Sequence, residues 1–230
     1  VNLSSNLQFI VLTNHGHPER CKATRWPPPT MITVIYAHPY PQHSRAGRAL
    51  LQGLEGLPHL QVRNLYQSYP DFHIDVQAEQ AALEASSTVV FQHPLHWYHM
   101  PALLSLWCEK VLTHGWAYGH RPDGQTAQAL AGKRFVWACT AGGDQAAYSL
   151  EGYNHFPMHQ IATPIEQLAR FCGMHWQAPC TVYHAGKLTD EELRQAAQGY
   201  RSRLIEEMVF HGLDPDTAPV PAQQEVQHAH

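Results

Sequence analysis

Short apolar runs alternate with segments of helical spacing along most of this chain. The runs are rich in β-branched and aromatic residues and too short for helices, whereas apolar residues recur every three or four positions in the segments between them. We expect strands at 32–37, 60–65, 89–92, 134–139 and 178–183, and helices at 44–57, 77–85, 101–113, 158–172 and 190–208. Such alternation predicts the α/β class, in which helices cover both faces of a parallel sheet.

The two ends of the chain lack this periodicity. Residues 1–30 include the run Trp26-Pro27-Pro28-Pro29, and we expect an N-terminal extension that is disordered, or a start site placed too early. Residues 213–230 are rich in Pro, Gln and His, which predicts a flexible tail. One folded domain is therefore expected over residues 31–212.

Two prolines bracket an aromatic segment after the third expected strand. Residues 93–101 read HPLHWYHMP, and Pro94 and Pro101 oppose regular structure before the next helix begins near Pro101. Open α/β sheets bind ligands at the carboxyl ends of their strands. Trp97 and Tyr98 therefore indicate a loop that covers a flat ligand, with a buried aromatic cluster as the alternative.

Two further loops follow strands at the same edge of the sheet. In residues 37–47, Ser44 is a candidate N-cap for a helix whose unpaired N–H groups could receive a phosphate. Residues 140–143 contain Gly142 and Gly143, which allow the backbone to approach a planar ligand and tolerate positive φ. Taken alone, these segments are more typical of an ordinary capped helix and an ordinary turn.

Long stretches of the chain resemble one group of flavoproteins. The segments that carry the resemblance are 92–98, 101–104, 106–107, 110–111 and 114–119. They are similar to the flavodoxin-like NAD(P)H:quinone oxidoreductases of the DT-diaphorase family, and most of all to the bacterial Kef ancillary flavoproteins, over about residues 31–204. The resemblance implies a flavodoxin-like three-layer sandwich whose five parallel strands have the order 2-1-3-4-5.

The resemblance also implies that the three loops hold a flavin. FMN is the implied cofactor, with FAD left open, and NAD(P)H is the implied co-substrate, with NADH and NADPH not distinguished. Gly47 stands where the family usually has an Asn, which implies the loss of one side-chain contact to the phosphate. The positions that match the family's cofactor-binding loops are His38, Ser44, Arg45, Ala46, Gly47, Leu95, His96, Trp97, Tyr98, Thr140, Ala141, Gly142 and Gly143.

Hydride transfer through a flavin requires groups that stabilise charge near the reduced ring. By resemblance, Tyr148 matches a Tyr that assists this step in the mammalian members. Straight alignment puts Asn154 where those members have a His, with Tyr153 before it and His155 after it. We expect Tyr148 first and His155 second as donors to the reduced flavin or the substrate oxygen. Surface residues with ordinary hydrogen bonds are the alternative for both.

Two functional classes follow from the resemblance. The first is an enzyme that reduces a quinone or related electrophile by ping-pong hydride transfer, in a homodimer whose sites are completed across the interface. The second is a regulatory flavin-binding subunit without significant turnover, because Kef ancillary proteins act on a glutathione-gated potassium/proton antiporter. The implied location is cytoplasmic, peripheral on the inner face of the membrane where the antiporter is bound.

Composition argues against several other classes. Fifteen Lys and Arg against 19 Asp and Glu give a net charge of −4, and no basic cluster suggests nucleic acid. No apolar run reaches the roughly 20 residues that cross a bilayer, and no secretory signal is evident. Five cysteines without close pairing indicate free thiols. His93, His96 and His99 raise the question of a metal, but Pro94 prevents the continuous helix that would align them, and we expect none.

Overall fold

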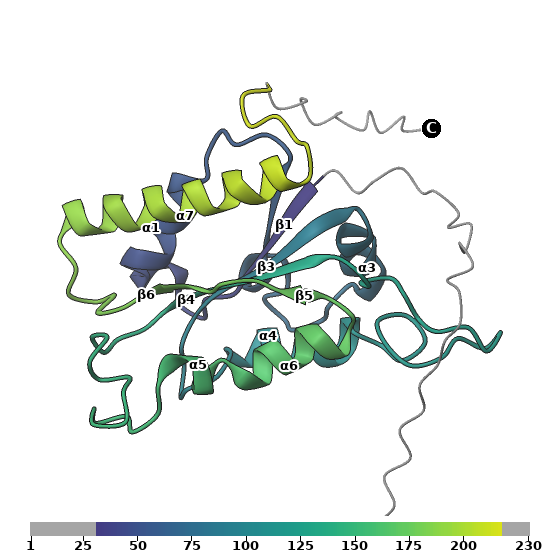
Figure 1. Ribbon diagram of the computed structural model, residues 1–230, viewed down its shortest axis with the longest axis horizontal. Helices are drawn as coiled ribbons and strands as arrows, with labels where there is room; N and C mark the ends of the chain where they lie inside the picture. The colour runs from purple at the N-terminus through teal and green to yellow at the C-terminus, as the bar shows by residue number, and fades with distance from the viewer. Residues whose placement is uncertain (1–30, 218–230) are drawn as a thin grey trace, which may run out of the picture.

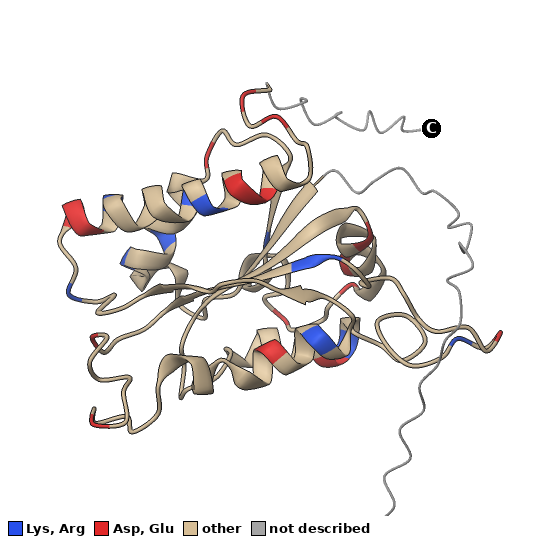
Figure 2. Ribbon diagram, in the orientation of Figure 1, with Lys and Arg blue, Asp and Glu red and all other residues tan. Residues whose placement is uncertain are grey.

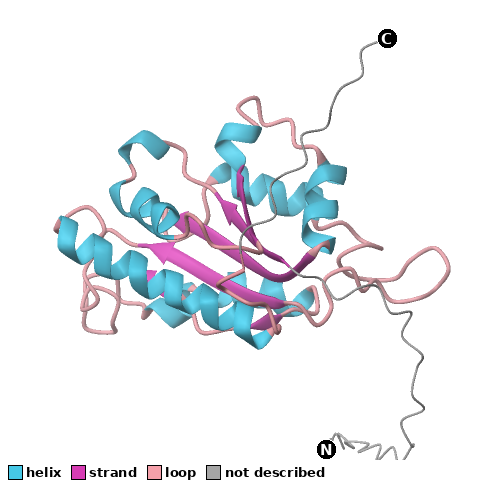
Figure 3. Cartoon of the chain, turned by 90° about the horizontal axis from the view of Figure 1, so that it is seen from above, coloured by secondary structure: helices cyan, strands magenta, loops and turns pink. Residues whose placement is uncertain are grey.

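The computed structural model describes residues 31–217 of the chain. The expected extension at 1–30 and residues 218–230 of the expected tail lie outside the described residues. Within them, helices cover both faces of a central parallel sheet, as the α/β pattern predicts (Figure 1). Seen from above, helices lie along the strands (Figure 3).

The sheet has the strand order β2-β1-β3-β4, completed by two short strands that both pair with β4. Every pairing is parallel, which confirms the order 2-1-3-4-5 implied by the resemblance. The strands are β1 (Met31–Tyr36), β2 (Leu60–Asn64), β3 (Ser86–Pro94), β4 (Arg134–Thr140), β5 (His175–Trp176) and β6 (Cys180–Val182). Two segments thus share the fifth position, where one strand at 178–183 was expected. Pro179 lies between them and has no N–H to donate, which interrupts the ladder.

Two hydrophobic clusters, one on each face of the sheet, pack the helices into two layers. Leu50 of α1 and Leu204 of α7 pack with Val90 on one face, whereas Trp107 of α4 packs with Phe91 on the other. Neighbouring residues of β3 therefore serve opposite faces, because side chains alternate along a strand. The helices are α1 (Arg45–Gly53), α2 (Leu65–Ser68), α3 (Val76–Glu84), α4 (Ala102–Val111), α5 (Met158–Ile161), α6 (Thr163–Phe171) and α7 (Asp190–Phe210), with a 3-10 turn η1 (Pro41–His43).

Three details differ from the expected elements. The single helix expected at 158–172 is two helices, α5 and α6, because Pro164 in the first turn of α6 cannot donate the hydrogen bond that would continue α5. The short helix α2 was not expected. The central strand β3 runs through Pro94, two residues beyond the expected end. The ladder continues because Leu95 supplies the next donor, its N–H binding the carbonyl oxygen of Thr140 at 2.8 Å.

Charged residues lie mainly on the helices and loops, and acidic and basic positions are interspersed along α6 and α7 (Figure 2). Two carboxylates on the helices, those of Glu79 in α3 and Glu207 in α7, are fully buried. Glu79 accepts hydrogen bonds from Arg63, Tyr69 and Trp107, and Glu207 binds Arg134. None of the helices in the described part of the chain combines the length and apolar character needed to cross a membrane.

Candidate active site

Contacts between distant segments bring the three expected ligand loops together at the carboxyl edge of the sheet. The His38 and His96 rings meet edge to face with centroids 6.0 Å apart, which joins the first loop to the second. The Leu95 N–H bonds to Thr140, which joins the second loop to the third. The loops after β1, β3 and β4 therefore lie together at one edge of the sheet, where open parallel sheets place their ligands.

Ser44 caps α1, as the sequence predicts. Its Oγ accepts a hydrogen bond from the Gly47 N–H at 3.1 Å, and both residues are buried. Because the first N–H groups of a helix have no partner within the helix, those of Arg45 and Ala46 remain for a ligand. The positive end of the helix dipole lies at the same place, which favours an anionic group such as a phosphate.

Gly47 packs closely against two hydroxyl groups. A Cβ at this position would lie 2.4 Å from Ser44 Oγ and 3.2 Å from the Tyr36 hydroxyl. A larger side chain at this position would displace the capping hydroxyl of Ser44. The Gln92 side chain fixes the same turn by donating from Nε2 to the Gly47 carbonyl oxygen at 3.1 Å.

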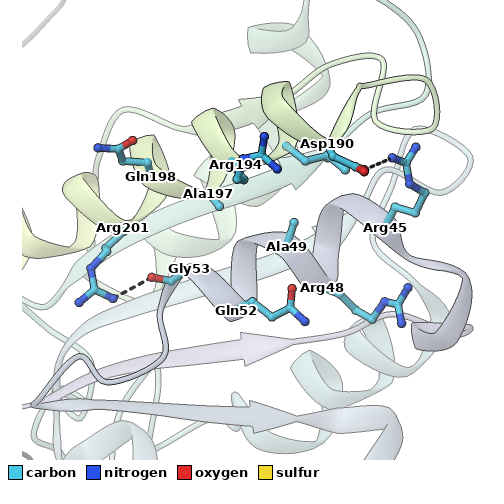
Figure 4. A pocket seen from close by; sticks show the side chains of 11 residues that line it. Arg45, Arg48, Ala49, Gln52, Gly53, Asp190, Arg194, Ala197, Gln198 and Arg201 are labelled. Carbon is cyan, nitrogen blue, oxygen red and sulfur yellow. Dashed lines mark hydrogen bonds and ion pairs between the residues drawn. The ribbon is translucent and has the colours of Figure 1, made fainter.

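Arg45 can meet a phosphate at the start of α1 through its backbone N–H but not through its side chain. Its guanidinium turns toward α7, where it donates to the Leu188 carbonyl at 3.1 Å and to Asp190 at 2.8 Å (Figure 4). The side chain therefore clamps α1 to the start of α7.

His38 is held as a neutral hydrogen-bond donor beside the phosphate loop. Its Nδ1 accepts from the Tyr40 N–H at 3.1 Å, so the proton of the neutral ring resides on Nε2. Burial, followed by the nearby His96 and His43, lowers the pKa of His38 to about 4. A neutral imidazole with one fixed tautomer can donate to an oxygen of a bound ligand at pH 7.

The aromatic loop forms a tight two-residue turn. His96 and His99 exchange backbone hydrogen bonds of 3.0 and 2.8 Å, and the two residues between them have positive φ, 48° at Trp97 and 63° at Tyr98. A turn with two positive φ values normally contains Gly or Asn, so two aromatic residues here store backbone strain. The Trp97 side chain is 95% exposed, which is consistent with a surface that receives a flat ligand and not with a buried aromatic cluster.

The glycine loop is shaped by close approach, and its glycines do not use the positive φ that they would tolerate. Neither Gly142 nor Gly143 has positive φ; both lie in a bend beside β6, next to Ala141, whose N–H is bound to the Val182 carbonyl at 2.8 Å. A Cβ on Gly143 would lie 2.7 Å from the Tyr153 hydroxyl, whereas one on Gly142 would meet nothing within 4 Å. The absence of a side chain at Gly143 lets Tyr153 pack against the loop, whereas the space next to Gly142 is open.

The structure places the two candidate donors differently. Tyr148 is half-buried next to Tyr183, with ring centroids 5.7 Å apart, and burial raises its pKa. His155 is exposed with φ 59°. Its neighbour Asn154 is buried, and the Asn154 Oδ1 accepts a hydrogen bond of 2.9 Å from the Tyr98 hydroxyl. Of the three residues left open at 153–155, Asn154 is therefore the one hydrogen-bonded to the aromatic loop.

The loop after β6 also contributes to this edge and was missed from the sequence. The His184 N–H donates to the Gly143 carbonyl at 2.8 Å, and the Tyr183 ring faces Tyr148. The signal that could have found it is its position, because it follows a parallel strand just as the other three loops do.

His93 is a hydrogen-bonded core residue. Its Nδ1 bonds to the Pro94 carbonyl at 2.9 Å, and its Nε2 accepts from the Trp137 indole N–H at 2.8 Å. Both ring nitrogens are thus used, and burial lowers its pKa to about 4. In residues 31–217 no three His, Cys, Asp or Glu side chains are grouped to hold a metal ion.

A cavity of about 650 Å³ lies between α1 and α7, and its lining includes Arg45 at the end of the first loop (Figure 4). The helices approach closely at Gly53, where an added Cβ would lie 3.0 Å from Ala197. The arginines that line the cavity bind the protein itself: Arg201 donates to the Gly53 carbonyl at 2.8 Å, and Arg48 donates from Nε to the Ser44 carbonyl at 3.1 Å. We interpret it as part of the α1–α7 contact.

The geometry of the loops fits a ligand with an anionic group at one end and a flat ring at the other. The start of α1 offers free N–H groups to the anion, and the aromatic turn and Gly142 leave space for the ring. One buried polar atom at the ring end, the Nδ2 of Asn154, has no hydrogen-bond partner among the described residues. These are the features that a phosphorylated flavin would need.

Comparison with known proteins agrees with this geometry. A protein family described by its flavodoxin-like fold matches residues 30–204. The glutathione-regulated potassium-efflux system ancillary protein KefF of Klebsiella aerogenes is 45% identical over 181 residues, 79% of this chain and 98% of that protein. KefF of Salmonella typhimurium is 43% identical over 183 residues, 79% of this chain and all of that protein.

Solved structures with the same fold have different names. A chain described as a thermophilic tryptophan halogenase from Streptomycin violaceusniger has a TM-score of 0.71 and 37% identity, over 75% of this chain and 98% of that one. General stress protein 14 of Treponema denticola, in complex with FMN, has a TM-score of 0.70 and 28% identity, over 76% of this chain and 98% of that one. A chain described as a putative quinone reductase of Klebsiella pneumoniae has a TM-score of 0.66 and 25% identity, over 84% of this chain and 87% of that one.

Proposed function

The chain belongs to the flavodoxin-like family that includes the KefF ancillary proteins, and on that premise we propose that it is an FMN-dependent NAD(P)H:quinone oxidoreductase. The names of similar proteins differ, so the proposal is argued from the site. The observation that carries it is the meeting of a capped helix start, an aromatic turn and a glycine loop at one edge of the sheet.

The residues divide into a phosphate end and a ring end. At the phosphate end, the N–H groups of Arg45 and Ala46 and the Nε2 of His38 would bind the FMN phosphate. At the ring end, residues 95–98 and 140–143 would line the isoalloxazine. The FMN bound by the Treponema denticola relative supports FMN over FAD.

Bound FMN supplies the hydride acceptor and donor, and the chain positions the reactants. We propose a ping-pong order in which NAD(P)H and then a quinone or related electrophile occupy the same open face beside Trp97. Tyr148 would donate a hydrogen bond to the reduced flavin or to the quinone oxygen. A tyrosine hydroxyl is protonated at pH 7, as a donor requires, and burial raises the pKa of this one further. His155, exposed on the same loop, is the second candidate donor.

The decisive experiment is the absorbance spectrum of the purified protein, followed by chromatography of the cofactor released on denaturation. We expect a flavin spectrum and FMN. Initial rates with NADH or NADPH, measured at several quinone concentrations, should give the parallel double-reciprocal lines of a ping-pong mechanism. A colourless protein that FMN does not titrate would refute the proposal.

A second role is favoured by the 45% identity to KefF, whose name describes an ancillary protein of a potassium-efflux system. We propose that the chain also binds and activates a glutathione-gated potassium/proton antiporter, as a peripheral protein on the cytoplasmic face of the inner membrane. Copurification with the antiporter without quinone turnover would leave a regulatory flavin-binding subunit as the function. Turnover without copurification would leave the enzyme alone.

We further propose a homodimer. The edge that carries the site exposes several large aromatic side chains, among them Tyr40, Tyr153 and Phe156, each at least 59% exposed. Large aromatic side chains exposed at one edge are typical of an interface. Sedimentation velocity should give a dimer near twice the 26.0 kDa chain mass, and a monomer at micromolar concentration would contradict this part of the proposal.

A further inference from the structure

One side-chain hydrogen bond connects the aromatic turn to the segment that follows the glycine loop. The Tyr98 hydroxyl donates to Asn154 Oδ1 at 2.9 Å, across 56 residues of sequence. Tyr98 lies in the strained turn with φ 63°, and its side chain is 53% exposed. An exposed ring on a strained turn has little packing to fix its direction, so this hydrogen bond is well placed to fix it.

Asn154 is itself held firmly. Its side chain is 9% exposed, and its backbone N–H donates to the Ala147 carbonyl at 3.2 Å. The turn around Ala147 is in turn fixed by Asp144, whose Oδ1 accepts from the Ala147 N–H at 2.8 Å. A rigid acceptor can hold a mobile donor, and Asn154 is the more rigid member of this pair.

The amide is a poor choice for stability alone. Its Nδ2 is buried without a partner, and an unpaired buried N–H group costs free energy that an apolar side chain of the same size would not. A residue serving only the core would be Leu. An Asn at this position is explained if its function is to accept the hydrogen bond from the Tyr98 hydroxyl.

We propose that Asn154 is a positioning residue that fixes the Tyr98 ring in the orientation needed to cover the isoalloxazine. The inference rests on the proposed flavin-binding function and deepens it. It differs from the roles given to Tyr148 and His155 because Asn154 acts through Tyr98 and need not touch the reacting atoms.

Four variants test this pair. Asn154→Leu and Tyr98→Phe each remove the hydrogen bond between these two residues. The double variant removes the same bond, so its effect should equal that of either single variant. Asn154→Asp retains an oxygen that can accept from Tyr98. Glu151→Gln is the matched control, because Glu151 is exposed on the same loop.

The first measurement uses flavin-free protein. Hydrogen exchange of the His96 and His99 amides should become several-fold faster in Asn154→Leu and Tyr98→Phe, remain slow in Asn154→Asp, and be unchanged in Glu151→Gln. Thermal unfolding of Asn154→Leu should occur at or above the wild-type temperature, because the unpaired Nδ2 is gone. A merely structural Asn would instead give a lower unfolding temperature and unchanged exchange in the turn.

The second measurement is FMN binding by quenching of flavin fluorescence. Loss of one hydrogen bond predicts dissociation constants about 3- to 10-fold higher for Asn154→Leu and Tyr98→Phe. The double variant should bind as weakly as either single one. Additive losses, or exchange in the turn that is equal in the wild type and Asn154→Leu, would overturn the inference. A wild-type protein that fails to bind FMN would overturn the proposed function instead, while the exchange rates still decide whether Asn154 holds the turn.

Discussion

Replacing Gly47 by Ala should separate the stability of the protein from its affinity for FMN. In an ordinary helix interior, Gly→Ala stabilises by roughly 1 kcal/mol. At Gly47 the added Cβ would lie 2.4 Å from Ser44 Oγ, so the capping hydroxyl must move. Loss of an N-cap costs about 1 kcal/mol. The two terms nearly cancel, and we expect the free energy of unfolding to change by less than about 1 kcal/mol.

The affinity for FMN should fall although stability does not. Displacing Ser44 disturbs the first turn of α1, which would supply the N–H groups that bind the phosphate. We expect a loss of about 10-fold, equivalent to roughly 1.4 kcal/mol. Because riboflavin lacks the phosphate, its weaker binding should change less than twofold. Fluorescence titration with both flavins and urea unfolding measure the two quantities.

The matched control is Gly199→Ala. Gly199 lies inside α7, and a Cβ there meets nothing within 4 Å, so this variant should be stabilised by roughly 1 kcal/mol and bind FMN normally. If Gly47→Ala behaves like Gly199→Ala in both assays, the steric argument and the place of the phosphate are refuted. If it weakens riboflavin and FMN equally, the disturbance is not confined to the phosphate end.

Three further predictions concern the core and the aromatic turn. Glu79→Ala leaves the Arg63 guanidinium without its buried partner and should lower the free energy of unfolding in urea by roughly 3 kcal/mol. Glu166→Ala removes an exposed ion pair and should lower it by under about 0.5 kcal/mol. Equal losses of stability in the two variants would contradict this prediction. His93 binds a proton more weakly when folded, with a pKa of about 4 against 6.5, so its own contribution should lower stability by up to about 3 kcal/mol as the pH drops from neutral to 4, in addition to any loss from His38, whose pKa is also about 4. His93→Gln should therefore lose less stability in acid than the wild type, and an equal loss in the two proteins would disprove the assignment. Trp97→Gly relieves positive φ and should raise stability by up to about 1 kcal/mol while weakening FMN binding, and a stability loss would show that the turn is not strained.

Sequence periodicity predicted most of the elements because each strand and helix is defined by contacts on its own faces. The end of β3 and the division of 158–172 were misjudged for one reason. Pro94 needs no donor where its strand ends, whereas Pro164 begins a new helix after the chain has already turned. The effect of a proline depends on the neighbour that its missing N–H would have met, and that neighbour lies elsewhere in the chain.

The strand order came from the resemblance, because periodicity does not record which strands are neighbours. The place of Arg45 shows the same limit. Its position at the start of α1 suggested a cofactor contact, but Asp190 and the Leu188 carbonyl, more than 140 residues later, compete for its guanidinium. A local pattern identifies which atoms are available, and the fold decides which of them are used.

The two ends of the candidate site differ in how far the sequence determines them. The phosphate end is local, because Ser44 and Gly47 are three residues apart and the cap forms as soon as α1 does. The ring end depends on the bond between Tyr98 and Asn154, 56 residues apart, and on strain in the turn that only tertiary contacts maintain. Destabilising the fold by mild denaturant should therefore loosen the ring end first. FMN affinity should approach that of the phosphate end alone before α1 unfolds.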